Sequence, residues 1–149
     1  MTQALKLGMK ISEIMTRDIA TVLIGTSVAD AARIMSERDV GMLPVMDAER
    51  VQGLVTDRDI TIRAVAGGLE CQAARVEDVM TTEVFYCYDD EDLEEAVECF
   101  EVKQIRRLLV FDRQDKLGGV LSIGDLAVDT GNKNLAGEVL MRVSEPLRD

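Results

Sequence analysis

The chain has 149 residues, of which 47% are hydrophobic and 30% are charged, as in a soluble globular protein of one domain or of two half-domains that share a core. Its formal net charge of −11 argues against binding to nucleic acid or to an anionic membrane surface, because both require clusters of Lys and Arg. No apolar run approaches the roughly 18 residues of a membrane helix, and residues 1–10 lack the apolar core of a signal peptide, so we expect a cytoplasmic protein.

The first half of the chain predicts elements in the order β-α-β-β-α. A β-prone run at residues 19–22 is followed by apolar residues at helical spacing between residues 28 and 35. Two apolar strands, at about 42–46 and 51–55, enclose a polar turn and are predicted to form a hairpin. A final helix is expected to begin at Thr56.

The second half predicts the same order again. A β-prone run at 84–87 precedes a helical pattern at 93–100, two strands at about 108–111 and 118–121, and a helix that begins at Ser122. Each copy has too few strands to cover its own apolar face. We therefore expect an α/β protein in which two tandem β-α-β-β-α repeats pack sheet to sheet with pseudo-twofold symmetry.

Three short motifs occur in both halves, in the same order. The first two recur after 65 residues and the third after 66, because one residue is inserted in the polar turn 113–116. An internal repeat of this kind indicates one supersecondary unit used twice. The three pairs are Ile14–Thr16 with Val79–Thr81, Leu43–Asp47 with Leu108–Asp112, and Gly53–Ile60 with Gly119–Leu126.

The repeats set the expected domain boundaries. Residues 9–68 form the first repeat and residues 76–145 the second, with a linker at 69–75. Residues 134–144 at the end of the second repeat are predicted to form a closing helix that Pro146 stops.

The residue types argue against catalysis and metal binding. The chain has no His, which removes the commonest general base and the commonest metal ligand. Its three cysteines, Cys71, Cys87 and Cys99, form no C-x-x-C pair, so neither a disulfide framework nor a zinc site is indicated. The acidic run 88–95 lacks the Gly and the alternate spacing of a calcium loop, and we interpret it as a solvated helix start.

The doubled motifs resemble those of the cystathionine β-synthase (CBS) domain, which usually occurs in tandem pairs that bind adenosine nucleotides. The resemblance covers about residues 9–145. It implies a β-α-β-β-α fold for each copy and a cleft between the paired copies with two symmetry-related sites. It also implies that Asp59 and Asp125 accept hydrogen bonds from ribose hydroxyls, while Thr56 and Ser122 contact the ribose or the phosphate.

The resemblance further implies which residues contact the adenine. The first strand of each repeat supplies backbone groups and side chains, and residues at the start of the next strand close the pocket. The first group is Ala20, Thr21, Phe85 and Tyr86, and the second is Met42, Pro44, Arg107 and Leu109, with Arg106 beside them.

The chemistry of the third motif supports a nucleotide site independently of the family resemblance. An ionised carboxylate is an acceptor only and can take both hydroxyls of a sugar diol, and a helix start offers free N–H groups to phosphate. The same T-x-x-D and S-x-x-D patterns are also variants of the helix capping box, worth about 1 kcal/mol, and the two roles can coexist.

Cations differ between the two repeats. Arg58 lies inside the third motif of the first repeat and is the best phosphate ligand there, because a guanidinium binds phosphate through two hydrogen bonds. The second repeat instead has Arg106 and Arg107 before its strand. We expect the two sites to be inequivalent and the first, with Thr56 and Asp59, to be the more complete.

Together these inferences predict a stand-alone regulatory module and not an enzyme. It would bind AMP, ADP or ATP, require no cofactor, signal by a change of conformation or association, and act on a protein partner. Helical faces outside the sheets favour a homodimer. Alternatives are a scaffold that has lost its ligand, a module for S-adenosylmethionine or NAD, and a small nucleotide enzyme, which the lack of a nucleophile and base pair disfavours.

Overall fold

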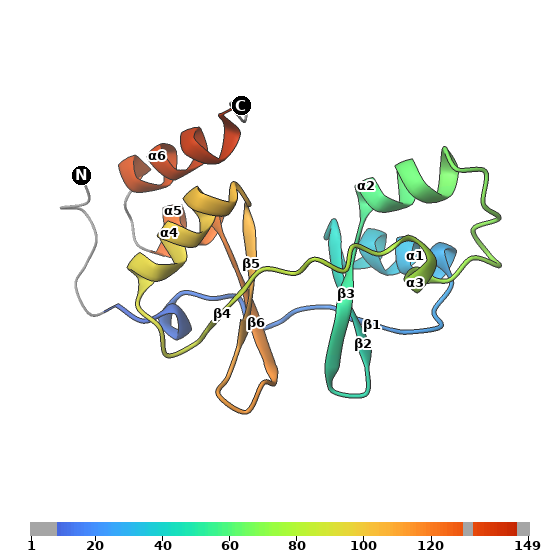
Figure 1. Cartoon of the computed structure of the whole chain (residues 1–149), viewed down its shortest axis with the longest axis horizontal. Helices are drawn as coiled ribbons and strands as arrows, with labels where there is room; N and C mark the ends of the chain where they lie inside the picture. The colour runs from blue at the N-terminus through green and yellow to red at the C-terminus, as the bar shows by residue number, and fades with distance from the viewer. Residues whose placement is uncertain (1–8, 130–132, 146–149) are drawn as a thin grey trace. The chain divides into compact units, whose positions relative to one another are not determined.

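The computed structural model describes residues 9–129 and 133–145, which form two compact units. One unit comprises residues 19–84, and the other combines the residues before 19 with those from 85 onward (Figure 1). Each unit has one three-stranded sheet with helices, so the mixed α/β fold with two repeats is confirmed. The packing of one sheet against the other stays a prediction.

The unit of residues 19–84 contains the sheet β1-β2-β3. Strand β1 runs parallel to β2, and β2 pairs antiparallel with β3 in the predicted hairpin. Its elements are β1 (Val22–Leu23), α1 (Val28–Arg38), β2 (Met42–Asp47), β3 (Arg50–Thr56), α2 (Asp57–Asp59), the π-helical turn η2 (Ile60–Val65) and α3 (Val76–Val79).

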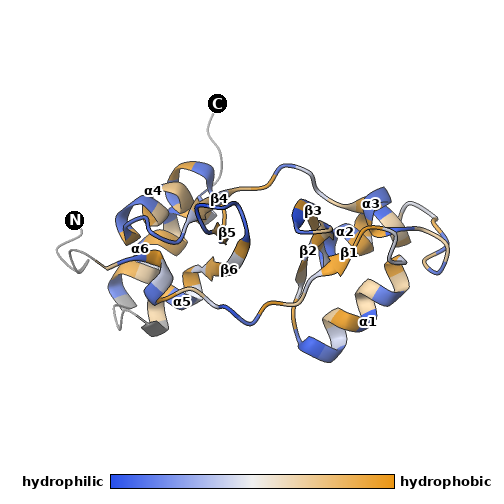
Figure 2. Ribbon diagram, turned by 90° about the horizontal axis from the view of Figure 1, so that it is seen from below, coloured by the Kyte–Doolittle hydropathy of each residue, from blue (hydrophilic) through white to orange (hydrophobic). Residues whose placement is uncertain are grey.

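Helix α1 begins and ends at recognisable caps. The Ser27 hydroxyl accepts a hydrogen bond from the Asp30 amide at 3.0 Å, and the helix ends where Asp39 adopts a left-handed conformation with φ 53°. Apolar and polar residues alternate around α1, as the colours of Figure 2 show. The apolar face is buried against the sheet, in a core that includes Val28, Ala31, Met35, Leu43, Val45 and Val55.

The other unit repeats this plan and adds a helix. Its sheet has the order β4-β5-β6, with β4 parallel to β5 and β5 antiparallel to β6. Its elements are the 3-10 turn η1 (Ile11–Glu13), β4 (Tyr86–Tyr88), α4 (Leu93–Lys103), β5 (Arg107–Phe111), β6 (Leu117–Ser122), α5 (Ile123–Asp129) and α6 (Lys133–Ser144).

Helix α6 occupies the segment for which a closing helix is predicted, whereas Pro146 lies outside the described residues. It contacts both α4 and α5. Its apolar side chains Leu135, Val139 and Val143 join Phe100, Leu108 and Leu121 in one buried cluster. The unit that contains α6 therefore has a larger core than the unit of residues 19–84, and α6 is part of that core.

Three local features differ from the sequence prediction. Strands β1 and β4 begin only at Val22 and Tyr86, because pairing starts where Val45 and Leu109 offer partners. The last helix of the first repeat is a single α turn that continues as η2, closed by a hydrogen bond from the Ala66 amide to a carbonyl five residues earlier. The short helices η1 and α3 were not predicted.

The compact units cut across the sequence repeats. The first motif of repeat one, Ile14–Thr16, lies in the unit of the second half, where Thr16 and Val120 exchange two backbone hydrogen bonds of 2.8 and 2.9 Å. Likewise Thr81 exchanges two backbone hydrogen bonds of 2.8 Å with Leu54 in the unit of residues 19–84. Each motif thus completes the unit of the other repeat.

The buried thiol of Cys87 gives a simple test of the second unit's core. Burial raises the pKa of Cys87 to about 12, and burial also raises the pKa of the partly buried Cys99. Because only a thiolate attacks an alkylating reagent, Cys87 should stay unmodified at pH 8 in the native protein and react after denaturation. Mass spectrometry after iodoacetamide treatment measures the extent of alkylation at each cysteine. Alkylation of native Cys87 as fast as of the part-exposed Cys71 would contradict the packing.

Candidate functional site

The acid of each third motif forms a reciprocal capping box with the hydroxyl residue before it. In the second repeat the Ser122 amide donates to Asp125 Oδ2 at 2.8 Å, and the Asp125 amide donates to Ser122 Oγ at 3.1 Å. In the first repeat Thr56 and Asp59 make the same two bonds, at 3.1 and 3.0 Å. The capping role is therefore present in both repeats, and it fixes the orientation of both carboxylates.

Each acid has a third partner that the sequence analysis missed. The hydroxyl of Thr16 lies 3.3 Å from Asp125 Oδ1, and the hydroxyl of Thr81 lies 3.2 Å from both carboxylate oxygens of Asp59. These threonines end the first motif of the opposite repeat. Their recurrence after 65 residues, next to a recurrence of the acids after 66, was the available signal, but a repeat alone does not reveal which copy pairs with which.

The two carboxylates keep unused acceptor capacity. An ionised carboxylate can accept about four hydrogen bonds, and the contacts above leave part of that capacity for further donors. Asp59 is the less accessible acid, with 8% of its surface exposed and Arg63 Nε at 3.9 Å from Oδ1, whereas Asp125 is half-buried. The acid of the second repeat is thus the more accessible to a ligand, although the sequence predicted that the site of the first repeat is the more complete.

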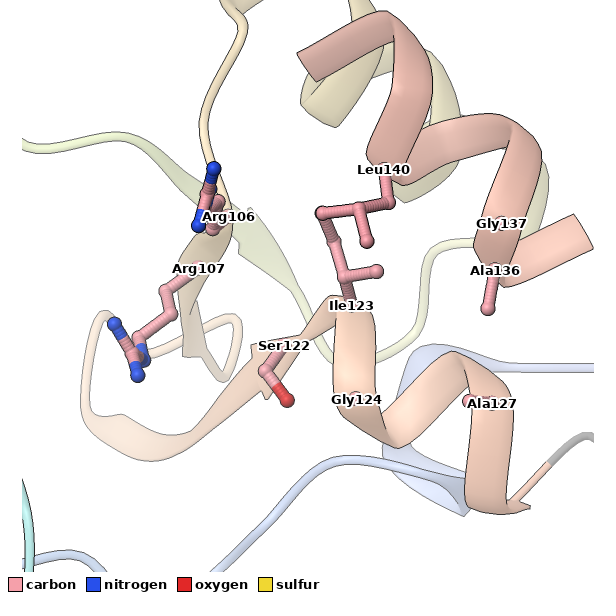
Figure 3. Close-up of a pocket in the computed structure, with 9 residues that line it drawn as sticks. All are labelled: Arg106, Arg107, Ser122, Ile123, Gly124, Ala127, Ala136, Gly137 and Leu140. Atoms are coloured by element: carbon pink, nitrogen blue, oxygen red, sulfur yellow. The ribbon is translucent and has the colours of Figure 1, made fainter. Parts of the chain in front are cut away.

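A cavity of about 500 Å³ lies beside the start of α5 in the second unit (Figure 3). It brings together three of the predicted site residues, Arg106, Arg107 and Ser122, but it is not lined by Asp125. The remaining lining residues come from α5 and α6 and are Ile123, Gly124, Ala127, Ala136, Gly137 and Leu140.

The predicted site residues of β2 and β5 occupy equivalent positions in the two repeats. Met42 pairs with Thr56 across the first hairpin, and Arg107 pairs with Ser122 across the second. Pro44 and Leu109 lie two residues further along and are buried. A side chain is therefore placed opposite each motif hydroxyl, apolar in one repeat and cationic in the other.

The predicted first-strand residues lie mostly before the strands themselves. Ala20 packs against the core of its unit, and Thr21 is exposed. Phe85 packs against the core of the other unit, with Lys103 Nζ 5.8 Å from the centre of its ring. Tyr86 is 52% exposed and meets Tyr88 and Phe111 edge to face.

Arg58 is exposed at the start of α2, where its amide donates to Asp57 Oδ1 at 2.8 Å. Within residues 9–129 and 133–145 no three Cys, Asp or Glu side chains gather in a way that could hold a metal ion. Helices that could span a membrane are likewise absent from those ranges.

Two tandem α/β repeats, each with a capped acid after a hairpin, define the class of this protein. The model of the CBS domain matches residues 11–65 and 76–128, and the chain belongs to the CBS domain family. It is 36% identical over 134 residues to the CBS domain-containing protein YhcV of Bacillus subtilis. The aligned region covers 90% of this chain and 94% of YhcV.

Solved structures share the fold. A protein from Pyrococcus horikoshii matches with a TM-score of 0.75 and 28% identity, over 87% of this chain and 97% of its own. The CBS domain pair of protein MJ0100, solved in complex with 5′-methylthioadenosine and S-adenosyl-L-methionine, matches with a TM-score of 0.70 over 85% of this chain and 98% of its own. At 22% identity, this second likeness concerns the fold alone.

Proposed function

We propose that this CBS pair is a regulatory module that binds an adenosyl compound through Asp59 and Asp125, with AMP, ADP and ATP as the first candidates. The observation that carries the proposal is the shared arrangement of the two acids. Each is fixed by its own capping box and by one threonine hydroxyl, and each retains acceptor positions that suit a sugar diol. The adenosyl ligands of the MJ0100 pair support this ligand class.

The module binds its ligand without transforming it, and it needs no cofactor. The chain has no His, and the hydroxyls of Thr56 and Ser122 accept hydrogen bonds from the backbone amides of Asp59 and Asp125. A hydroxyl held in this way next to a carboxylate suits recognition of ribose. Nucleophilic attack would require an adjacent base aligned to take its proton.

The threonine partners suggest how binding could produce a signal. Thr16 lies just before the point where the chain leaves one unit at residue 18, and Thr81 lies just before it returns at residue 85. A ribose hydroxyl that binds Asp125 would share its carboxylate with the Thr16 hydroxyl, which lies 3.3 Å from Oδ1. Ligand occupancy would thereby alter the two segments that connect the units, and this change of conformation is the proposed output.

We also propose that the module works in the cytoplasm as a homodimer and acts on a protein partner. Exposed apolar side chains on helical segments of each unit support association, Ile62 and Val65 of η2 in one unit and Met141 of α6 in the other. Analytical ultracentrifugation with and without ligand tests this part of the proposal. A monomer under both conditions would contradict it.

Thermal unfolding with a panel of adenosyl compounds tests ligand binding. The panel is AMP, ADP, ATP, S-adenosylmethionine and NAD. A ligand present at 100 times its dissociation constant stabilises the fold by about 2.7 kcal/mol, which raises Tm by several degrees. A rise with S-adenosylmethionine or NAD alone would move the assignment to that ligand, and no response to any compound would favour the scaffold alternative.

Substitution of the acids tests the site itself. We expect Asp125→Asn and Asp59→Asn to weaken binding about tenfold or more, because hydrogen bonds to a charged group contribute about 1.5–3 kcal/mol. Asp78→Asn is the matched control: Asp78 accepts from the Arg75 amide at 2.8 Å in the same capping geometry but belongs to no third motif. Calorimetric titration measures the affinities. Equal affinity in both motif variants and the control would show that the acids do not hold the ligand.

A further inference from the structure

Arg63 joins the acid of the first repeat to a neighbouring backbone segment. It lies four residues after Asp59, on the helical turn that continues α2, and this spacing brings both side chains to the same side of the turn. Its Nε lies 3.9 Å from Asp59 Oδ1, which is an ion-pair distance. Because the Asp59 side chain is only 10% exposed, salt and solvent screen this attraction weakly.

The same guanidinium caps the end of α3. Its Nη1 donates to the backbone oxygens of Val79 at 3.1 Å and of Met80 at 2.9 Å. Carbonyls at the end of a helix have no partner within the helix, and a guanidinium has enough N–H groups to bind two of them while its Nε faces a carboxylate. Arg63 thus bridges Asp59 and the two residues that precede Thr81, the other side-chain partner of this acid.

The second repeat lacks this bridge. The residue that stands 66 positions after Arg63 is an acid, Asp129. Among the described residues no Lys or Arg side chain lies within ion-pair distance of Asp125. The turn η1, which corresponds to α3 in the repeat, is instead capped by Arg17, whose Nη2 donates to the Ser12 oxygen at 2.8 Å. This cap comes from the same segment as the turn and does not involve the acid.

We propose that Arg63 is a positioning residue that couples the Asp59 carboxylate to residues 79–81. The inference rests on the proposed function, in that a ribose bound to Asp59 supplies the change that is transmitted. Hydroxyls that donate to the carboxylate take up part of its negative charge and so weaken its attraction for the guanidinium. Arg63 then holds the two backbone oxygens less firmly, and the segment that leaves this unit at residue 84 loosens. A ligand at Asp125 has no arginine through which to act.

A double-mutant cycle in the ligand-free protein tests the coupling. Asp59→Asn and Arg63→Gln should each speed hydrogen exchange at the Met80 amide, which donates to the Val76 oxygen at 2.9 Å, by about tenfold. The double variant should exchange no faster than the faster single variant, because either change removes the same link. Additive effects, or unchanged exchange in Asp59→Asn, would overturn the coupling.

The other unit provides the matched control. The Met15 amide donates to the Ile11 oxygen at 3.0 Å, which is the bond equivalent to that of Met80. Arg17→Gln removes the cap of η1, and Asp125→Asn removes the charge of the acid. Their effects on exchange at Met15 should add, because no arginine joins them. Equal non-additivity in both cycles would show that Arg63 is not the link and would overturn its assignment.

Ligand affinity supplies an independent readout. Adenosine is the probe, because it carries the ribose diol without a phosphate that would itself attract Arg63, and an Asp125→Asn background isolates the first site. By reciprocity, a ligand that weakens the link binds more tightly once the link is gone, so Arg63→Gln should bind adenosine about fivefold more tightly. A purely structural role for Arg63 would weaken binding, as Asp59→Asn should.

The coupling and the adenosyl assignment fail separately. Calorimetric titration without binding of any adenosyl compound would contradict the adenosyl assignment, while the ligand-free cycle would still decide the coupling. Weaker adenosine binding in both Arg63→Gln and Asp59→Asn would overturn the coupling and leave the adenosyl site in place.

Discussion

Replacing Gly119 by Ala is expected to destabilise the protein by about 3–5 kcal/mol. A Cβ at Gly119 would lie 2.6 Å from the backbone oxygen of Thr16, a separation that real Cβ atoms do not adopt, and 3.2 Å from Met15 Sδ. The backbone must move, and the Thr16–Val120 bridge beside it loses two hydrogen bonds. Overpacking costs about 1–3 kcal/mol and each hydrogen bond about 1 kcal/mol.

The neighbouring glycine is the matched control. A Cβ at Gly118 would lie 3.7 Å from both Met15 Cε and the Val110 oxygen, which is ordinary contact. Gly118→Ala should therefore be neutral or stabilising, because Ala loses less backbone entropy than Gly on folding. Gly53→Ala should lose about as much stability as Gly119→Ala, since its Cβ would lie 2.6 Å from the Thr81 oxygen.

Urea unfolding followed by circular dichroism measures the free energy of unfolding of all three variants. Equal stability of Gly118→Ala and Gly119→Ala would contradict the pairing of the first and third motifs.

Replacing Phe100 by Ala is expected to cost about 3–5 kcal/mol, the usual price of removing a buried aromatic side chain. Phe100 is fully buried on α4, in the cluster that also contains Leu135, Val139 and Val143 of α6. Removal of its ring should therefore also loosen α6. Hydrogen exchange at the amides of α6 should accelerate more than exchange at those of α1, which belongs to the other core.

A conservative variant tests how the loss of stability depends on the volume removed at the same position. Phe100→Leu keeps an apolar side chain of intermediate volume and should lose less stability than Phe100→Ala. A cost below about 1 kcal/mol for Phe100→Ala would contradict the burial of this side chain, since surface substitutions usually fall within ±0.5 kcal/mol.

Much of the fold was predictable because local pattern and local structure agree. The helical spacing of residues 28–35 and 93–100 predicted α1 and α4, and the apolar runs around their polar turns predicted both hairpins. The short helices η1 and α3 were missed because long-range contacts hold them. The Ile11 amide donates to the Glu91 oxygen, and the Val76 amide donates to the Thr26 oxygen.

The candidate site was only partly accessible from sequence. The importance of Asp59 and Asp125 followed from a duplicated motif, and their capping role from the T-x-x-D and S-x-x-D spacing. Their bonds to Thr81 and Thr16 depend on which motif crosses to which sheet, and repeat spacing carries no such information. The cavity beside the start of α5 was also not predicted, because α6 lines it and only the packed structure places Gly137 near Arg106.

A crystal structure of the full chain grown with AMP tests the central claim most directly. We predict that the ribose 2′- and 3′-hydroxyls lie within hydrogen-bond distance, about 2.5–3.0 Å, of the carboxylate of Asp125 or of Asp59. AMP bound with its ribose turned away from both acids, or held elsewhere on the chain, would contradict the claim.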